Sequence, residues 1–446
     1  MATLEDVLRL QKTSNILTSP REGSKTESTV KATTSSTLNI ALQNQTSSST
    51  VYAYITGLAI DNNNALFLLQ SDGQTPYYPS SPSSTLSPLG ANCAIPLGAP
   101  GNTVTVTIPH LAGARLWFSR DSTLTFYLNP GPALVEPSVS NKSDPNYNVY
   151  WDFCEFTFNS AQLYANISYV DFVSLPISLT LTNTSGATQH VSGLPSNGLD
   201  TICSALTAQN AQDNAGWDQL IVTLNGANLR ALSPNTGIIM NSSLFSGYYQ
   251  PYVDQVWSKY ASATLSVDTQ TSSGTVTGTV SNGVLNFSGV TTYSQPSTAD
   301  IFSCSSGPFA PTGNAEIDAI TARLAAAFNR STLLIDSDQP DDEVVSTYYQ
   351  NSITNHYARI LHATYLDGRG YAFPYDDVGP SNGVDQSGSV YDPNPQLLTV
   401  AVGGANATAS PAAPKKNVTS RRRVRGFIKR FVAKLKTELA RLKLRK

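Results

Sequence analysis

The first third of the chain is a series of short segments in which apolar and polar residues partly alternate. Clusters of Gly, Asn, Pro or Ser bound each segment, and no helical pattern separates one segment from the next. A period of two is typical of β-strands, and closely spaced strands without helices between them predict a sandwich or a barrel. The clearest segments are residues 37–45, 51–60, 65–70, 103–109 and 114–119.

The composition of the 446 residues also favours a mainly β fold. Charged residues make up 13% of the chain, compared with roughly 25% in an ordinary globular protein. Ser, Thr, Asn and Gln take their place, together with 29 Gly and 26 Pro. Because Thr, Val and Tyr favour strands while Gly and Pro favour turns, such a chain is expected to be rich in strands.

The middle of the chain has a mixed pattern. The best helix is predicted at 314–329, where Ile317, Ile320, Leu324 and Phe328 recur at spacings of three and four residues. Further helices are expected at 199–212, 246–260 and about 344–362, and strands at 261–268, 274–280, 283–287, 371–373 and 397–402, with Asn282-Gly283 as a hairpin turn. This pattern predicts an all-β lobe with an inserted mixed α/β lobe, and final strands that close the first lobe.

The domain organisation follows from these patterns. The expected parts are a disordered polar leader at 1–36, a main domain at 37–402 with a β lobe at about 37–185 and 366–402 and an α/β lobe at about 186–365, a linker at 403–420, and a basic amphipathic helix at 421–446. The C-terminal residues also differ from the rest of the chain in their charge. Residues 415–446 hold 14 Lys or Arg and one acid, whereas the remainder holds 14 basic and 30 acidic residues.

Two interpretations of the basic tail stay open. It is either a solvated extension or a tether to an anionic surface, such as a membrane face or an acidic wall polymer. No nucleic acid partner is expected, because the acidic body would repel phosphate.

No metal site or other cofactor is predicted. The cysteines lack the CxxC spacing of zinc sites, and both two disulfides and four free thiols stay open. The four are Cys93, Cys154, Cys203 and Cys304. His356 and His362 would need a third ligand to hold a metal, and neither a phosphate-binding loop nor a Gly-Xaa-Ser-Xaa-Gly motif occurs.

The segment around Glu155 is the most informative for chemistry. On a strand, Glu155, Thr157 and Asn159 would share one face, while Cys154, Phe156 and Phe158 would share the other. Glu155 would then stand in a row of hydrogen-bonding groups beside aromatic residues, and partial burial suits a general acid.

A second carboxyl, Asp171, follows at the end of another strand-like run. If the two runs pair as an antiparallel hairpin, Glu155 and Asp171 can lie near one mouth, as hydrolysis of a glycosidic bond requires. Simple alternation would place Asp171 on the side of Ile167 and Tyr169, so a bulge or the end of the strand must turn it. Two exposed strand acids without a catalytic role are the alternative.

Residues 37–402 resemble glycoside hydrolase family 64, the β-1,3-glucanases related to thaumatin-like proteins. The strongest match is Glu155-Phe156-Thr157 with Asn159, Tyr164, Ala165-Asn166, Ser168 and Val170-Asp171-Phe172, followed by Asn355-His356-Tyr357-Ala358-Arg359, His362, Asp367-Gly368 and 371–378. The resemblance implies a thaumatin-like β-sandwich or barrel lobe, with an open groove between it and the α/β lobe.

The resemblance also implies the roles of individual residues. Glu155 would be the general acid and Asp171 the base that activates water in an inverting endo-acting hydrolysis of β-1,3-glucan. Thr157, Asn159, Tyr164 and Ser168 would line the glucan-binding groove. Tyr164 stands where bacterial members tend to have Trp, and Ser168 replaces a typical Thr, which leaves subsite affinity and product length open.

Asp376 and Asp377 could bind sugar hydroxyls along the groove, or cap a turn before Gly379-Pro380. The rival to an enzyme is a non-catalytic glucan-binding protein of the thaumatin-like class. Residues 1–25 do not read as a secretory signal, because acids come early and no apolar run follows. Secretion is implied only by the resemblance, so the cellular location stays open.

Overall fold

The structure is a computed structural model that describes residues 34–404 except 342 and 382. Residues 1–33 of the predicted leader, residues 405–420 of the predicted linker and the predicted basic helix at 421–446 lie outside the described residues. Among the residues described, no helix is both long enough and apolar enough to span a membrane.

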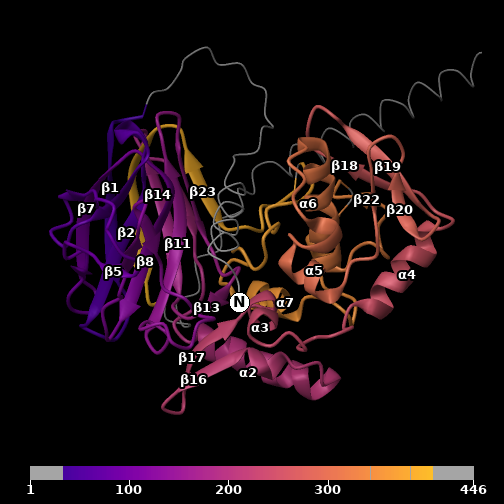
Figure 1. Ribbon diagram of the computed structural model, residues 1–446, viewed down its shortest axis with the longest axis horizontal. Helices are drawn as coiled ribbons and strands as arrows, with labels where there is room; N and C mark the ends of the chain where they lie inside the picture. Colours follow the sequence, from indigo (N-terminus) through magenta and orange to yellow (C-terminus); the bar gives the residue numbers. More distant parts are fainter. Residues whose placement is uncertain (1–33, 342, 382, 405–446) are drawn as a thin grey trace, which may run out of the picture. The chain divides into compact units, whose positions relative to one another are not determined.

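Two large sheets form the β lobe (Figure 1). One has five strands in the order β15-β14-β24-β1-β7, with bounds Thr188–Val191, Ile177–Asn183, Pro395–Val402, Thr37–Asn44 and Thr103–Pro109. The other has eight strands in the order β23-β12-β11-β8-β2-β3-β4, with β6 also paired to β2. Their bounds are Ser389–Asp392, Leu163–Ile167, Tyr150–Phe158, Leu111–Arg120, Val51–Ala59, Ala65–Leu69, Pro76–Tyr77 and, for β6, Ile95–Pro96.

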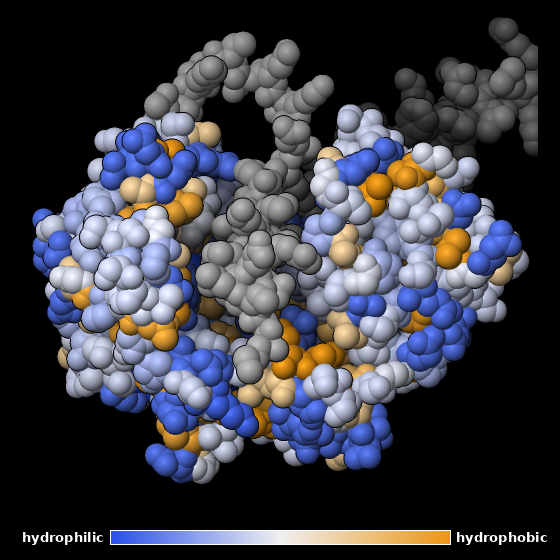
Figure 2. All heavy atoms as spheres, viewed as in Figure 1, coloured by the Kyte–Doolittle hydropathy of each residue, from blue (hydrophilic) through white to orange (hydrophobic). Residues whose placement is uncertain are grey.

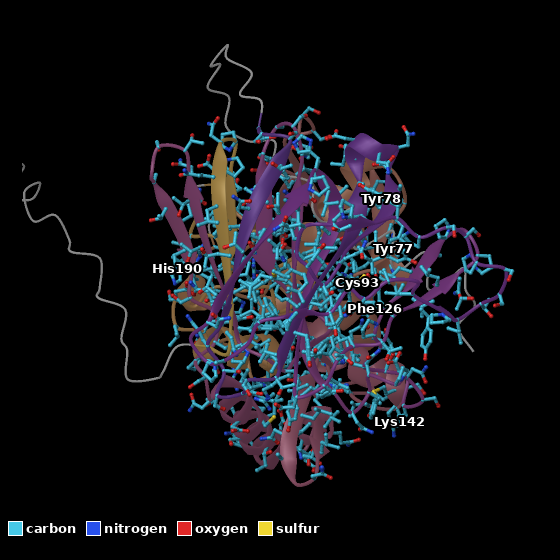
Figure 3. All side chains as sticks on the ribbon, turned by 90° about the vertical axis from the view of Figure 1, so that its left-hand side faces the viewer. Tyr77, Tyr78, Cys93, Phe126, Lys142 and His190 are labelled. Carbon is cyan, nitrogen blue, oxygen red and sulfur yellow. The ribbon has the colours of Figure 1, made fainter. Side chains whose placement is uncertain are left out.

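Alternating apolar residues hold these sheets together. On β1, Leu38, Ile40 and Leu42 are buried, and they belong to one hydrophobic core that receives side chains from both sheets. Both sheets are open at their edges, so within the described residues the β lobe is a sandwich and not a closed barrel. Figure 3 shows His190, on edge strand β15, and Tyr77, on edge strand β4, on opposite sides of the view.

The last strands of the main domain return to the β lobe. β24 lies between β14 and β1 and runs parallel to β1, and β23 pairs with β12 at the edge of the larger sheet. The predicted return of the chain at 397–402 is therefore confirmed.

Two smaller sheets of three strands each accompany the sandwich. The first has the order β10-β9-β5, at Ala133–Val135, Tyr127–Asn129 and Ser87–Pro88. The second has the order β13-β17-β16, at Phe172–Val173, Ala227–Leu232 and Ile221–Leu224. β13 follows β12 of the larger sheet and pairs with β17 of the inserted part.

The inserted part contains a second five-stranded sheet, beside which α4 and α6 lie in Figure 1. Its order is β21-β20-β19-β18-β22, at Thr291–Tyr293, Val284–Phe287, Thr275–Ser281, Leu265–Asp268 and Asp338–Gln339. The helices are α2 Gly198–Asp213, α3 Pro234–Met240, α4 Gln250–Tyr260, α5 Thr298–Ser303, α6 Ala315–Arg330 and α7 His356–Thr364. Short 3-10 helices lie at Ile60–Asn62, Trp217–Leu220, Gly307–Phe309 and Val345–Thr347.

Local sequence accounts for several of these elements. Asn314 caps α6 by accepting hydrogen bonds from the backbone N–H groups of Glu316 and Ile317. Asn282 and Gly283 have φ values of 51° and 80°, as a two-residue hairpin turn between β19 and β20 requires. The helix at 314–329 and this turn are confirmed.

Two predicted elements are wrong. The helix expected from about 344 begins only at His356, because Tyr349 adopts a left-handed backbone with a φ of 60° and Asn355 provides the cap of α7. The strand expected at 371–373 is a turn, from which only Tyr371 forms an isolated bridge to Ser168.

All four cysteines fall within the described residues, and all four are buried free thiols. Cys93, labelled in Figure 3, is 4% exposed. Of the two alternatives that the sequence leaves open, four free thiols is the one that the structure adopts.

Candidate active site

The register of four strands places a row of polar residues across the larger sheet. Glu155 on β11 lies opposite Arg115 on β8 and Asn166 on β12, and Asn166 lies opposite Ser389 on β23. Directly opposed residues share one face of a sheet, so these four side chains belong to the same face.

The other face of β11 belongs to the core of the sandwich. Cys154, Phe156 and Phe158 are at most 1% exposed, whereas the Glu155 side chain is 21% exposed. The predicted division of the strand into a buried face and a polar face is confirmed. A bulge in the pairing of β11 with β8, between Phe156 and Phe158, follows directly after the acid, and bulges often re-aim side chains beside active sites.

Asp171 reaches this face because the strand ends before it. β11 and β12 pair as the expected antiparallel hairpin, but β12 ends at Ile167 and β13 begins at Phe172. Asp171 therefore lies in a bend, where its side chain no longer follows the alternation of β12. Its backbone carbonyl accepts a hydrogen bond from Ser233 N at 2.9 Å, which fixes the bend against the segment before α3.

A cleft of about 640 Å³ contains both carboxyls, a volume typical of ligand sites. The sandwich supplies one wall, including Glu155, Asn166 and Asp171, and the helical part supplies another, including Thr236, Ile239 and Thr321. Ile239 is 61% exposed. Figure 2 shows hydrophobic residues around α3 and α7 on this face, between more hydrophilic surfaces to either side.

A third carboxyl and a guanidinium complete the charged part of the cleft. Arg115 donates a hydrogen bond from Nε to Glu155 Oε1 at 3.3 Å and a second, very short one from Nη1 to Glu136 Oε2. Glu136 lies directly after β10 and lines the same cleft. The rings of Phe153 and Trp117 lie 4.9 Å and 5.6 Å from the guanidinium carbon and limit its hydration.

The electrostatics of the cleft shift several protonation equilibria. Loss of hydration between the walls of the cleft raises the pKa of Asp171, although its side chain stays accessible to solvent, and the charge of Glu155 adds to the rise. Loss of hydration likewise raises the pKa of Glu136, against the opposing effect of Arg115. The surrounding carboxyls outweigh the desolvation of Arg115 and raise its pKa further.

Two of the predicted groove residues lie in the cleft. Tyr164 and Ser168 both line it, and Ser168 forms a backbone bridge to Tyr371, which lines it too. Burial raises the pKa of the Tyr164 phenol, and the charge of Asp377 adds to the rise. Tyr164 also lies opposite Tyr391 on β23, whose side chain is 58% exposed.

Thr157 and Asn159 lie outside the lining of the cleft. Thr157 is opposite Tyr164 and on the face of Glu155, so it continues the polar face along β11. Asn159 lies beyond the end of β11, and its Oδ1 accepts hydrogen bonds from the backbone N–H groups of Ala161 and Gln162. Its side chain therefore stabilises the hairpin turn.

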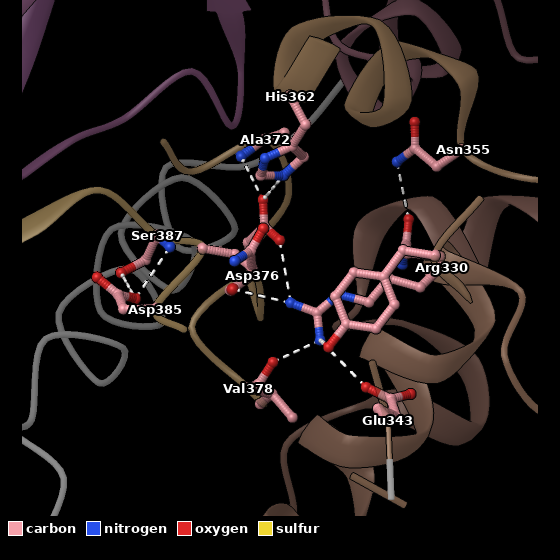
Figure 4. A network of polar contacts seen from close by, with 12 residues as sticks. Arg330, Glu343, Asn355, His362, Ala372, Asp376, Val378, Asp385 and Ser387 are labelled. Atoms are coloured by element: carbon pink, nitrogen blue, oxygen red, sulfur yellow. Dashed lines mark hydrogen bonds and ion pairs between the residues drawn. The ribbon is translucent and has the colours of Figure 1, made fainter. Parts of the chain in front are cut away.

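Asp376 and Asp377 are not part of the lining either. The Asp376 carboxyl is fully buried and accepts hydrogen bonds from Arg330 Nη2 at 3.1 Å, His362 Nε2 at 2.8 Å and Ala372 N at 2.9 Å (Figure 4). In this structure it has no surface to offer to a sugar. It instead holds the segment from Tyr371 to Tyr375, both of which line the cleft.

The two histidines of α7 have structural partners. His362 also contacts Gly368 O through Nδ1 at 2.9 Å, and His356 Nδ1 accepts a hydrogen bond from Arg359 Nε at 2.9 Å. Burial and the charge of Arg359 lower the pKa of His356 to about 4. Within residues 34–404 without 342 and 382, no group of three or more His, Cys, Asp or Glu is arranged to hold a metal ion.

The sequence patterns did not single out Arg115 and Glu136. They precede Glu155 by 40 and 19 positions, and only the register of β8 with β11 and the path of the chain after β10 bring them together. Asn166 was part of the matched segment, and its position opposite Glu155 could have been derived from the predicted hairpin once its register was known.

Comparison with known proteins places the chain in a family. The family model described as β-1,3-glucanase, glycoside hydrolase family 64, matches residues 36–402. A glucan endo-1,3-beta-glucosidase from Arthrobacter sp. (strain YCWD3) is 31% identical over 322 residues, covering 70% of this chain and 56% of the relative. A protein of the same name from Cellulosimicrobium cellulans is 31% identical over 317 residues, covering 69% of this chain and 55% of the relative. The chain thus spans about half the length of these two relatives.

A solved structure is similar over most of the fold. The crystal structure of a laminaripentaose-producing β-1,3-glucanase in complex with laminaritetraose has a TM-score of 0.73 and 31% identity to this chain, covering 82% of this chain and 98% of that chain. The family match, the relatives and this shared fold agree with one another, and the chain belongs to glycoside hydrolase family 64, the β-1,3-glucanases.

Proposed function

We propose that this protein is an endo-acting hydrolase of β-1,3-glucan and that Glu155 and Asp171 are its two working carboxylates. The observation that carries the proposal is that both carboxyls line one cleft in a chain of this family. Hydrolysis of a glycosidic bond needs one carboxyl to protonate the leaving oxygen and one to act on water or on carbon.

In the proposed inverting mechanism, Glu155 donates its proton to the glycosidic oxygen as the bond to the anomeric carbon breaks. Asp171 takes a proton from a water molecule, whose oxygen forms the new bond on the opposite face of the sugar. The solvent-accessible side chain of Asp171 supports its role as the base, because water can reach it. The partly buried Glu155 beside Phe153 supports the role of an acid with limited hydration.

The substrate class rests on the family and on the shape of the cleft. The relative of known structure binds laminaritetraose, and we propose that a laminarin-like chain of β-1,3-linked glucose lies in the corresponding cleft here. Tyr164 and Ser168 would contact the sugar rings inside the cleft, and Thr157 and Asn159 would do so only where the chain extends along β11. Asp377 is a further candidate, whereas the buried Asp376 would act by holding the wall of the cleft.

The rival proposal, a glucan-binding protein without activity, is tested by release of reducing ends from laminarin. We expect release by the wild type and a loss of about 10²–10⁴-fold in Glu155→Gln, while laminarin binding is retained. Glu316→Gln, the same chemical change at the start of α6, is the matched control and should keep wild-type activity. Binding without release by the wild type would favour the rival.

We also propose that the basic tail is a tether to an anionic surface. The 14 basic residues between 415 and 446 against one acid support it, since each can contribute about 1 kcal/mol near an anionic bilayer. Deletion of 415–446 should abolish salt-sensitive binding to vesicles that contain an anionic lipid and leave laminarin hydrolysis unchanged. Equal vesicle binding with and without the tail would reject the tether.

A further inference from the structure

Arg115 is shared between two carboxyls of the cleft, Glu136 and Glu155. It donates a hydrogen bond from Nη1 to Glu136 and another from Nε to Glu155, which is 3.3 Å long. Charge-assisted N–H···O contacts are usually about 2.7–2.9 Å long, so the contact to Glu155 is weak for an ion pair. Among the carboxyls that act on this guanidinium, Glu136 has the largest electrostatic effect.

The surroundings of Arg115 keep it in this position. Its side chain is 19% exposed, and the rings of Phe153 and Trp117 face the guanidinium. Glu136, whose side chain is 20% exposed, approaches from the segment after β10 rather than from the large sheet. The hydrogen bond to Glu155 comes from Nε alone, so the contact is a single bond and not the two parallel N–H···O bonds of a strong arginine–carboxylate pair.

The cluster holds more carboxyls than cations. Glu136, Glu155 and Asp171 surround one guanidinium, and the three carboxyls influence one another or Arg115 electrostatically. With every carboxyl ionised, one cation would leave two negative charges uncompensated in a cleft of limited hydration. Like charges in such a site oppose complete ionisation.

We propose that Glu136 is a positioning residue, which binds Nη1 of Arg115 and so shares the charge of that cation with Glu155. The positive charge that Arg115 would otherwise present to Glu155 alone is thereby divided between two carboxyls, which suits a residue that must donate a proton. A guanidinium that paired with Glu155 alone would stabilise the ionised carboxylate of Glu155 and oppose the action of Glu155 as an acid. This inference rests on the proposed hydrolysis of β-1,3-glucan and adds a part played by a residue outside the catalytic pair.

The test is the dependence of kcat/KM on pH with laminarin as substrate. In Glu136→Gln, the cation is free to pair fully with Glu155, so the alkaline limb should move to lower pH by about one unit. In Arg115→Gln, the cation is absent, and the alkaline limb should move to higher pH. The double variant should lie close to the wild type, because the cation and the group that restrains it are both gone.

The size of the effect separates positioning from catalysis. At its own pH optimum, Glu136→Gln should keep kcat within about tenfold of the wild type, whereas loss of a general acid costs about 10²–10⁴-fold. Glu316→Gln should leave the profile unmoved. Thermal unfolding of each variant checks folding, and the shift expected for Arg115→Gln tests the same idea if Glu136→Gln does not fold.

Three outcomes would contradict the inference. An alkaline limb of Glu136→Gln that coincides with that of the active wild type would overturn it and leave the proposed function intact. Loss of activity at every pH, as deep as in Glu155→Gln, would make Glu136 a catalytic residue instead. An inactive wild type would overturn the proposed function and this inference together.

Discussion

Arg115 Nε lies 3.3 Å from Glu155 Oε1, across opposed positions of β8 and β11. This contact brings the only cation among the charged side chains that line the described cleft next to the proposed acid. Asp171 influences the same guanidinium from the bend after β12. The register of β8 with β11 therefore places Arg115 beside Glu155, and the end of β12 places Asp171 near them. The effects of these charges can be measured through pH dependence and substitution.

The fall of kcat/KM at low pH, the acidic limb, should reflect the protonation of Asp171. A base must be ionised, so kcat/KM falls as pH drops through its pKa, and loss of hydration in the cleft raises that pKa. The limb should lie above the ordinary aspartate value of about 3.9. A profile of laminarin hydrolysis that shows full activity at and below that value would contradict the assignment.

Substitution of Asp376 should affect stability. Asp376→Asn removes the buried carboxylate that pairs with both Arg330 and His362 and leaves Glu343, 3.7 Å from Nη1, beside Arg330. Breaking a buried pair costs about 3–5 kcal/mol of unfolding free energy. Asp121→Asn is the matched control, because Asp121 pairs with Arg120 at the surface and is 57% exposed. Its cost should stay below about 1 kcal/mol. Urea denaturation measures both, and equal losses would refute the structural role of Asp376.

His362 should make stability depend on pH. Both ring nitrogens face acceptors, the carbonyl of Gly368 and the carboxylate of Asp376, so both must donate. Burial alone would lower the pKa of His362, but Asp376 and the Gly368 carbonyl outweigh it and raise the pKa.

The sign of this dependence follows from the raised pKa. The contribution of His362 is fully present below the unfolded-state pKa of about 6.5 and is lost as pH rises through the higher folded-state pKa. The unfolding free energy of the wild type should therefore fall over that range relative to His362→Gln. Parallel curves of unfolding free energy against pH for the two proteins would show that His362 is not charged in the fold.

Gly193 should tolerate no side chain. Its φ is 65°, and a Cβ there would lie 1.9 Å from the carbonyl oxygen of Ile177 on β14. Gly186 has a φ of 82° with nothing within 4 Å of its Cβ position, so Gly186→Ala isolates the backbone strain of roughly 1–2 kcal/mol. Gly193→Ala should lower the unfolding free energy by clearly more than this control. Equal melting temperatures for the two variants would contradict the close contact.

Local patterns were enough to predict much of the fold. The strands at 37–45 and 103–109, the apolar stripe of α6 and the turn at Asn282-Gly283 each depend on neighbouring residues, and each is confirmed. The helix predicted from about 344 was wrong in its start, because the mixture of apolar and polar residues there does not reveal the left-handed backbone at Tyr349. The strand predicted at 371–373 was wrong, because the backbone conformation of this segment depends on distant partners of Asp376, the buried Arg330 and His362.

The features of the candidate site likewise fall into those that local sequence patterns predict and those that they do not. The facing of Glu155 and the hairpin with β12 follow from alternation over a few residues. The contributions of Arg115 and Glu136 do not, because they require the register between β8 and β11 and the position of a loop that no local pattern determines. Asp376 is the opposite case, because this acid lies within a matched segment and yet is buried in a network of ion pairs.

Proton NMR of laminarin during hydrolysis tests the central claim most directly, because it records activity and stereochemistry together. If Glu155 is the acid and Asp171 activates water, the β-linked glucan should release α-anomeric reducing ends first, which mutarotation later equilibrates, and Asp171→Asn should release almost none. β-Anomers as the first product, or no product from the wild type, would contradict the account.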